Sequence, residues 1–317
     1  MVVRFRITTA AGRQSRAAAR QRVGNLRDMR IAPATKVRYE RAVEAFFEYM
    51  EREGLDLPQD APAFDAALCE YIDSLWHNGD GVGLASNTLS GLQHEVPSLR
   101  RNLSGAWQFI GLWQRLELPV RSTPAWFELV AAMAGMALHD GDIGMAAGVL
   151  LGWECLLRTG EIGATTLGSV TILRGGTAAM VDLGWTKGAL RKRVVEEVTA
   201  RDSRCVALLL YLLQRRRPGE LIVEGGTRAF ATKFSQYLRR LGLEDIGLTP
   251  YCLRRGRATA LWQETGSLAR VQTAGRWANM RTARLYVDGA AAQLTQVRLP
   301  EAKHRLLRRW GLTLAEL

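Results

Sequence analysis

The sequence predicts a mainly α-helical protein that carries a small antiparallel β-sheet and is divided between two domains. Apolar residues recur at helical spacing over residues 33–118 and again from residue 203 onward. Between these regions, residues 170–195 contain short β-prone runs separated by glycine-containing turns. A length of 317 residues with 47% hydrophobic content is sufficient for two ordinary domains with cores of their own.

Residues 1–30 form a strongly basic tail. They contain eight Arg and one Asp, so +7 of the formal net charge of +12 lies in this segment. Because the tail has little apolar surface to bury, we expect it to be disordered and solvated. Two alternatives stay open: an arm that orders on the phosphate backbone of DNA, and an organelle transit peptide. The tail lacks the continuous apolar stretch of a secretory signal, so export is not expected.

Residues 31–120 are predicted to form a compact domain of four amphipathic helices. The helices are expected over residues 35–54, 65–79, 86–97 and 103–118. Asp65 is the predicted N-cap of the second helix, and the Asn78-Gly79 pair ends it.

The segment Ser122-Thr123-Pro124 predicts a joint between the domains near residue 121, because proline disfavours a continuous helix there. Helices are expected beyond it over residues 126–136 and 143–157. Three β-prone runs follow at residues 170–173, 179–183 and 193–195, and they predict the small antiparallel sheet. The helical period resumes at Ser203 and continues to the end of the chain.

The net charge of +12 makes a polyanion the expected partner, with nucleic acid ahead of an anionic membrane surface. The longest apolar run, residues 144–155, is too short to cross a bilayer. Four cysteines lie far apart without a C-x-x-C pair, so we expect reduced core residues and neither disulfides nor metal ligands.

Three short motifs contain residues suited to chemistry. Arg158 and Glu161 lie three residues apart, a pattern that by itself is more often a weak surface ion pair. Tyr251 and Arg254 are also three apart, which places them on one face of a helix. Residues 249–286 contain seven Arg and one acid and end at Tyr286. A solvated helix face mixes charges of both signs more evenly, so this local net charge of +6 close to a tyrosine is unusual for a surface helix.

The order of these motifs resembles the tyrosine recombinases of the phage-integrase type. The matching positions are Arg158 and Glu161, Lys187 in a predicted hairpin, Tyr251 and Arg254, and Trp277 nine residues before Tyr286. The run Gly-Arg-Trp at residues 275–277 is similar to the recombinases of eukaryotic mobile elements of the DIRS and crypton kind. The resemblance covers residues 121–317 and implies a catalytic domain there, preceded by a helical core-binding domain that clamps DNA over residues 31–120.

This resemblance implies a site-specific recombinase or integrase that cuts and rejoins DNA through a 3′-phosphotyrosine. Tyr286 would be the nucleophile, and Arg158 and Arg254 would clamp the phosphate, because a guanidinium is a two-pronged donor that stays charged. Lys187 would protonate the departing 5′ oxygen, although an ordinary exposed hairpin lysine is the alternative. Glu161 would orient its neighbours. No metal ion or other cofactor is expected.

Two positions differ from the commonest pattern of that family, which has His at both. Tyr251 donates a hydrogen bond well but is a poor proton shuttle near neutrality. It therefore leaves open a catalytically weak or inactive domesticated relative that binds DNA. Trp277 can still donate its indole N–H to a phosphate oxygen. DNA contacts are predicted for the other arginines of the region, namely Arg255, Arg257, Arg276, Arg281 and Arg284.

The expected partner is double-stranded DNA, held by a tetrameric synapse of identical protomers. By resemblance, residues 294–317 would dock on a neighbouring protomer, but their many apolar residues are equally suited to packing in cis. The protein is expected in the nucleus of a eukaryote or with the nucleoid in a bacterial cytoplasm. A type IB topoisomerase is an alternative that shares the chemistry but usually has a longer chain. A basic RNA-binding protein is a further alternative, and the absence of an aromatic-rich RNP1 strand from the sequence argues against it.

Overall fold

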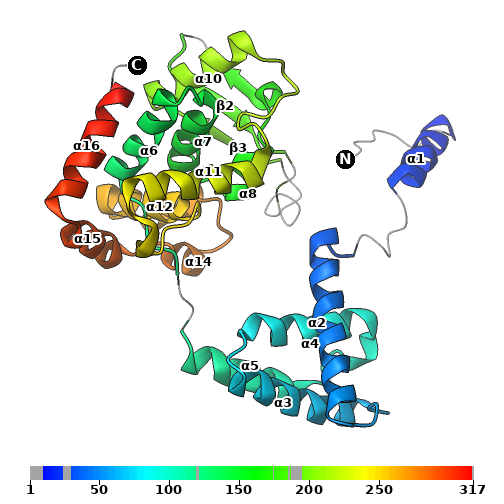
Figure 1. Ribbon diagram of the computed structural model, residues 1–317. Helices are drawn as coiled ribbons and strands as arrows, with labels where there is room; N and C mark the ends of the chain where they lie inside the picture. Colours follow the sequence, from blue (N-terminus) through cyan, green and yellow to red (C-terminus); the bar gives the residue numbers. More distant parts are fainter. Residues whose placement is uncertain are drawn as a thin grey trace. The chain divides into compact units, whose positions relative to one another are not determined.

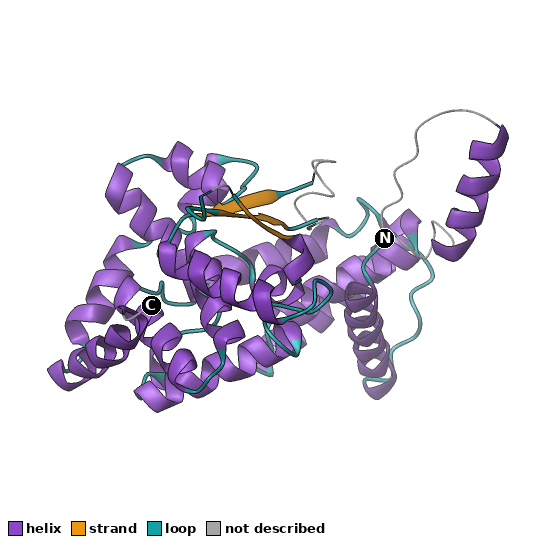
Figure 2. Cartoon of the chain, turned by 90° about the horizontal axis from the view of Figure 1, so that it is seen from above, coloured by secondary structure: helices purple, strands orange, loops and turns teal. Residues whose placement is uncertain are grey.

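The computed structural model describes residues 10–23, 30–118, 121–173, 175–184, 186 and 195–315. The chain divides into two compact units, Met1–Val120 and Arg121–Leu317, and the division lies next to the Ser122-Thr123-Pro124 segment. Helices predominate in both units, and the second unit also contains a small sheet (Figures 1 and 2). The predicted fold class, mainly α with a small antiparallel sheet, is confirmed.

The basic tail contains a helix where the sequence predicted disorder. Helix α1 covers Ala10–Val23, and the side chains of Arg13, Arg20 and Arg22 are exposed. Between Arg13 and Val23 the tail is rich in Ala, Arg and Gln and contains neither Gly nor Pro. Ala, Arg and Gln all have high intrinsic helix propensity, so local preference favours the helix without help from a core. Residues 1–9 and 24–29 lie outside the described residues.

The first unit has a helical core, as predicted. Phe46, Leu68, Leu89 and Leu103 are fully buried in one apolar cluster to which each of its longer helices contributes. The elements are α2 (Pro33–Arg52), α3 (Ala61–His77), α4 (Val82–Glu95), η1 (Pro97–Leu99) and α5 (Ser104–Leu116).

Asp65 does not cap the second helix as predicted. Helix α3 begins four residues earlier, and its N-cap is Asp60, whose carboxylate accepts the N–H of Ala63 at 2.9 Å. Asp65 instead accepts the backbone N–H groups of Gly105 and Ala106 at 2.8 Å each. The first N–H groups of a helix lack partners within the helix, so Asp65 satisfies the start of α5 from another helix.

The second unit is built around α7, which is buried along residues 144–153. A helix that is apolar on all sides is stable only when other elements surround it, and α6, α8, α10, α11 and α12 all pack against α7. The helices are α6 (Phe127–His139), α7 (Ile143–Glu154), α8 (Thr159–Ala164), α10 (Ser203–Arg215), α11 (Gly226–Leu241), α12 (Cys252–Thr265), α13 (Leu268–Ala274), α14 (Met280–Arg284), α15 (Gly289–Arg298) and α16 (Glu301–Ala315), with short 3-10 turns η2 (Leu167–Ser169) and η3 (Glu244–Ile246).

The described strands form an antiparallel sheet in the order β1 (Val170–Ile172), β2 (Ala179–Asp182) and β3 (Glu197–Ala200). Val170 pairs with Val181, and Ala179 pairs with Ala200, so these four side chains lie on the face that joins the core. The third strand was predicted at residues 193–195 and lies later in the chain. Residues 197–200 alternate between outward and inward side chains, which fits a half-buried edge strand, whereas Arg193 and Val194 lie outside the described residues.

Helix α16 packs in cis against α6 of the same chain (Figure 1). Leu307 and Leu314 are buried in the core of the second unit, and the ring of Trp310 meets that of His139 edge-on at 5.2 Å. The approach is close, because a Cβ added at Gly135 would lie 1.9 Å from the carbonyl oxygen of Trp310. Of the two arrangements that the sequence left open for this segment, the structure has the cis arrangement for α16.

The four cysteines are free thiols: three are buried, and Cys69 is half-buried. Within the described part of the chain, no helix combines the length and the apolar character needed to cross a membrane.

Candidate active site

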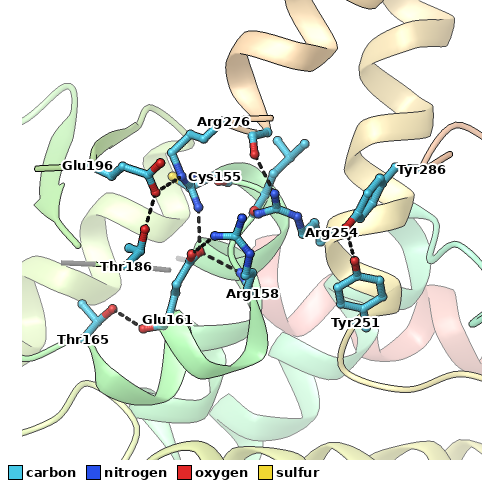
Figure 3. Close-up of polar contacts among 12 residues, drawn as sticks. Cys155, Arg158, Glu161, Thr165, Thr186, Glu196, Tyr251, Arg254, Arg276 and Tyr286 are labelled. Atoms are coloured by element: carbon cyan, nitrogen blue, oxygen red, sulfur yellow. Dashed lines mark hydrogen bonds and ion pairs between the residues drawn. The ribbon is translucent and has the colours of Figure 1, made fainter. Parts of the chain in front are cut away.

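Arg158 and Glu161 lie at the start of α8, directly after the buried helix α7. The chain turns at Leu156, whose φ of 49° is left-handed, and Arg158 then occupies the N-cap of α8. Glu161 accepts the backbone N–H of Arg158 at 2.9 Å and also pairs with its guanidinium (Figure 3). The Arg158 side chain is 34% exposed and lines a cleft of about 400 Å³ between α8 and the residues that follow β2. Arg158 is therefore a cation accessible to an anion.

Arg254 lies in the first turn of α12 and is completely buried, at 0% exposure. Its terminal nitrogens donate to the carbonyl oxygens of Leu156 and Gly275, the second at 2.6 Å. Among the described residues, no hydrogen-bond partner contacts its buried Nε. The guanidinium carbon lies 5.6 Å from the ring centre of Tyr286, so the charge of Arg254 acts on this phenol at short range.

Tyr286 follows α14 and lies between two aromatic residues from other parts of the site. Its ring packs on Trp277 with 4.3 Å between ring centres, and it joins a small apolar cluster with Val271 and Ala283. The hydroxyl of Tyr251, which precedes α12, donates a hydrogen bond to the hydroxyl of Tyr286 (Figure 3). Two phenol oxygens thus meet beside the buried charge of Arg254.

The surroundings shift the pKa values of the two phenols in opposite directions. Burial raises the pKa of Tyr251, and acting as donor to Tyr286 raises it further. Burial also acts to raise the pKa of Tyr286, but hydrogen bonds from Tyr251 and Trp277 and the charges of Arg254 and Arg158 outweigh it, so the pKa of Tyr286 is lowered. The arrangement favours a phenolate at Tyr286 beside a protonated Tyr251.

Arg276 was predicted to contact DNA, but the structure holds it inside the protein. Its side chain is only 8% exposed. It donates to Glu161 at 2.6 Å, to the carbonyl oxygen of Cys155 at 3.1 Å and to Glu196 at 3.3 Å. Glu196 also accepts the hydroxyl of Thr186 at 2.6 Å (Figure 3). Arg276 therefore links Glu161, Cys155 and Glu196 inside the protein, and it is not exposed to bind a phosphate at the surface.

Arg255 is likewise buried, contrary to the prediction that it contacts DNA. Its side chain is 4% exposed, donates to the carbonyl oxygen of Ser122 and pairs with Asp288 at 3.3 Å. The start of α12 is buried on most sides, so the adjacent positions 254 and 255 both lie inside the protein. Arg257 pairs with Glu264 at 2.6 Å at the edge of the unit.

Arg281 and Arg284 remain exposed on α14. Among the arginines predicted to bind DNA, these two present their side chains to the surface.

No protein-family model matches the sequence, and no curated protein matches it. Solved structures do match. The Tn1549 transposon integrase in complex with transposon right end DNA has a TM-score of 0.60 at 11% identity, over 90% of this chain and 99% of that one. A lambda integrase dimer bound to a COC′ core site has a TM-score of 0.56 at 14% identity, over 87% and 75%. The XerH recombinase in a post-cleavage complex has a TM-score of 0.50 at 16% identity, over 74% and 68%.

The chain has the fold of the tyrosine recombinases. Within this recombinase fold, the structure brings together five of the residues predicted to be catalytic, and they come from the turn before α8, the start of α12 and the region around α14. These residues are Arg158, Tyr251, Arg254, Trp277 and Tyr286 (Figure 3 labels four of them). The sixth, Lys187, lies outside the described residues.

Glu196 and Thr186 were not predicted from the sequence, although both belong to the polar network of this candidate site. Glu196 is 5% exposed and begins the run into β3, next to the exposed Glu197. The adjacent pair Glu196 and Glu197 lies in a β-prone run and matches no recognisable motif. The sequence therefore does not show which of the two side chains faces inward. A carboxylate that follows a strongly basic run of the sequence was the single available signal.

Proposed function

We propose that this protein is a site-specific DNA recombinase that cuts and rejoins duplex DNA through a 3′-phosphotyrosine at Tyr286. The observation that supports it most is the convergence at Tyr286 of one buried guanidinium, one solvent-accessible guanidinium and a hydrogen-bond donor. A phenol surrounded in this way is activated toward phosphorus, because each neighbour stabilises negative charge on its oxygen.

In the proposed reaction, the Tyr286 phenol first loses its proton to water, and the phenolate then attacks the scissile phosphorus. A bond forms between phosphorus and the Tyr286 oxygen, and the bond from phosphorus to the 5′ oxygen breaks. Lys187 supplies the proton for the departing 5′ oxygen. Rejoining is the reverse, with a 5′ hydroxyl attacking the phosphotyrosine, so the linkage retains the energy of the broken bond.

The arginines of the site have different roles in this proposal. Arg158 is accessible from the cleft and donates to the non-bridging oxygens of the phosphate, where charge builds in the transition state. Arg254 was expected to clamp the phosphate with both prongs. Because its terminal nitrogens already donate to carbonyl oxygens, we assign Arg254 an electrostatic role, in which its buried charge stabilises the Tyr286 phenolate.

Double-stranded DNA is the proposed substrate. The similar Tn1549 integrase is described in complex with transposon right end DNA, and the similar lambda integrase dimer is bound to a core site. The formal net charge of +12 and the exposed arginines of α14 suit a phosphate backbone. We further propose that the first unit clamps the duplex and that four protomers assemble for strand exchange, as the resemblance implies.

The experiment is a nicked suicide duplex, in which loss of the short 5′ fragment prevents religation and traps the covalent adduct. We expect a DNA-linked protein with wild type in the presence of EDTA, because guanidinium groups supply the positive charge. Tyr286→Phe must abolish the adduct, and mass spectrometry of the wild-type adduct must locate the nucleotide on Tyr286. An adduct of normal yield with Tyr286→Phe, or a nucleotide found on Tyr251, contradicts the assignment.

A DNA-binding relative without cleavage activity is the second candidate. Two observations favour it: the raised pKa of Tyr251 keeps this phenol protonated, so it cannot accept a proton, and the terminal nitrogens of Arg254 are occupied. Sequence-specific DNA binding without an adduct from any cleavable substrate would decide for this candidate.

A further inference from the structure

Glu196 is a buried carboxylate at the entry to β3, at the centre of the site's polar network. Its side chain is 5% exposed. The Oε2 atom accepts the hydroxyl of Thr186 at 2.6 Å and the Nε–H of Arg276 at 3.3 Å. A buried carboxylate is stable only when donors surround it, and two of the donors to Glu196 are Thr186, which follows β2, and Arg276, which lies between α13 and α14.

Arg276 links Glu196 to the residues that face the phosphate. Its two terminal nitrogens donate to Glu161 and to the carbonyl oxygen of Cys155. Glu161 is shared, because it also holds the guanidinium and the backbone N–H of Arg158. Figure 3 shows the resulting chain from Glu196 through Arg276 and Glu161 to Arg158.

The backbone at Arg276 is strained. Its φ of 58° is left-handed, a conformation that costs a non-glycine residue roughly 1 kcal/mol or more. The preceding Gly275 supplies the carbonyl oxygen that holds Arg254, and the following Trp277 packs on Tyr286. The contacts of the Arg276 side chain therefore fix a turn on which both Arg254 and Tyr286 depend.

Electrostatic balance also requires Glu196. The guanidinium groups of Arg158, Arg254 and Arg276 lie close enough that the other two lower the pKa of Arg254, after the larger effect of burial. Within the described residues, Glu161 and Glu196 are the carboxylates that pair with these cations. Without Glu196, Arg276 would be attracted more strongly to Glu161 and would compete with Arg158 for it.

We propose that Glu196 is a positioning residue of the recombinase site, which acts through Arg276 to hold Arg158 and Arg254 in the geometry that the chemistry needs. The proposal rests on the proposed function for its kinetic readout. It does not make Glu196 a catalytic residue, because Glu196 touches neither the phosphate position nor Tyr286.

The first test compares Glu196→Gln with Glu197→Gln in the full chain. The two positions are adjacent, but Glu197 is exposed, so it controls for loss of one negative charge in β3. We expect Glu196→Gln to slow single-turnover adduct formation at saturating DNA at least tenfold, with the Kd for DNA changed less than twofold. A general loss of structure would weaken binding as well. Equal rates for the two variants would overturn the proposal.

The second test is a double-mutant cycle with Arg276→Gln. If Glu196 acts through Arg276, the double variant must be no slower than Arg276→Gln alone, within about twofold. Losses that multiply would show independent action and would overturn the proposal. Should Glu196→Gln fail to fold, Thr186→Val takes its place, because it removes one donor to Glu196 and keeps the side-chain shape. It must then slow the reaction, and a wild-type rate would overturn the proposal.

The third measurement does not depend on activity. Nitrogen-15 NMR of the arginine Nε–H groups reports how well Arg276 is held, and Glu196→Gln must accelerate exchange of this proton with water at least fivefold, whereas Glu197→Gln must not. If the wild type forms no adduct on any substrate, the proposed function fails. The exchange rates still show whether Glu196 holds Arg276, and unchanged exchange would overturn that claim.

Discussion

The hydroxyl of Tyr251 donates a hydrogen bond to the hydroxyl of Tyr286. The donor is the phenol with the raised pKa, and the acceptor is the phenol with the lowered pKa. The two shifts support each other, since a protonated Tyr251 stabilises a phenolate at Tyr286. Tyr251 therefore acts as a fixed hydrogen-bond donor to Tyr286.

Tyr251→Phe should move the pH dependence of cleavage to higher pH. The reactive form is the Tyr286 phenolate, so the rate rises with pH up to the pKa of Tyr286, and removing the donor raises that pKa. Below the pKa, each unit of increase lowers the rate about tenfold at fixed pH. The measurement is the single-turnover adduct rate against pH, with the exposed Tyr211→Phe as control. A profile that keeps its position would show that the hydrogen bond does not tune Tyr286.

Arg255→Gln should destabilise the second unit, whereas Arg281→Ala should weaken DNA binding. Arg255 is buried against Ser122 and pairs with Asp288, whose side chain is 39% exposed, and loss of hydrogen bonds made by a charged group costs roughly 1.5–3 kcal/mol. Arg281 is exposed, so its loss should leave the free energy of unfolding within about 0.5 kcal/mol.

Urea unfolding and the salt dependence of DNA binding distinguish the effects of the two variants. Losing one phosphate contact should reduce the slope of log K against log salt by about 1. If Arg255→Gln lowered this slope and kept full stability, its side chain would leave the interior when DNA binds.

Gly135→Ala should loosen the contact between α6 and α16. The added methyl group would lie 1.9 Å from the carbonyl oxygen of Trp310, and backbone cannot move as easily as a side chain. Overpacking of this kind costs about 1–3 kcal/mol. Hydrogen exchange of the α16 amides should become faster in this variant.

Gly111→Ala is the matched control within a helix. A Cβ at Gly111 meets no atom of the described residues within 4 Å, so higher helix propensity should stabilise α5 by about 0.5–1 kcal/mol. Unchanged α16 exchange in Gly135→Ala would mean that α16 is not held at this contact.

Asp65→Ala should destabilise the first unit more than Asp73→Ala does. Both residues belong to α3, but Asp65 holds the first N–H groups of α5, and loss of such a cap costs about 1–2 kcal/mol. Asp73 is largely exposed and makes one pair with His77, which contributes about 0.5 kcal/mol or less. Urea unfolding of the two variants gives the comparison, and equal stabilities would contradict the role of Asp65.

Helical spacing alone was sufficient to predict helices α2, α3, α4 and α5 of the first unit and helices α6 and α7 of the second. A side chain that recurs every three to four residues must face one direction once a helix forms, so the apolar pattern locates both the element and its buried face. The apolar pattern was less informative for the strands, because their positions depend on pairing with distant segments of the chain. The strand β3 is defined by its pairing with β2, and the local run at residues 193–195 is as β-prone as residues 197–200.

The sequence by itself determined the helical class, the apolar helix α7, and the order in which Arg158, Tyr251, Arg254, Trp277 and Tyr286 occur. Tertiary structure alone decided which arginines are structural: Arg255 and Arg276 look like Arg281 in the sequence, yet they are buried on carboxylates and carbonyl oxygens. The physical reason is that burying a charge is favourable only beside suitable partners. For Arg276 those partners lie 80 and 115 residues away in the chain, at Glu196 and Glu161.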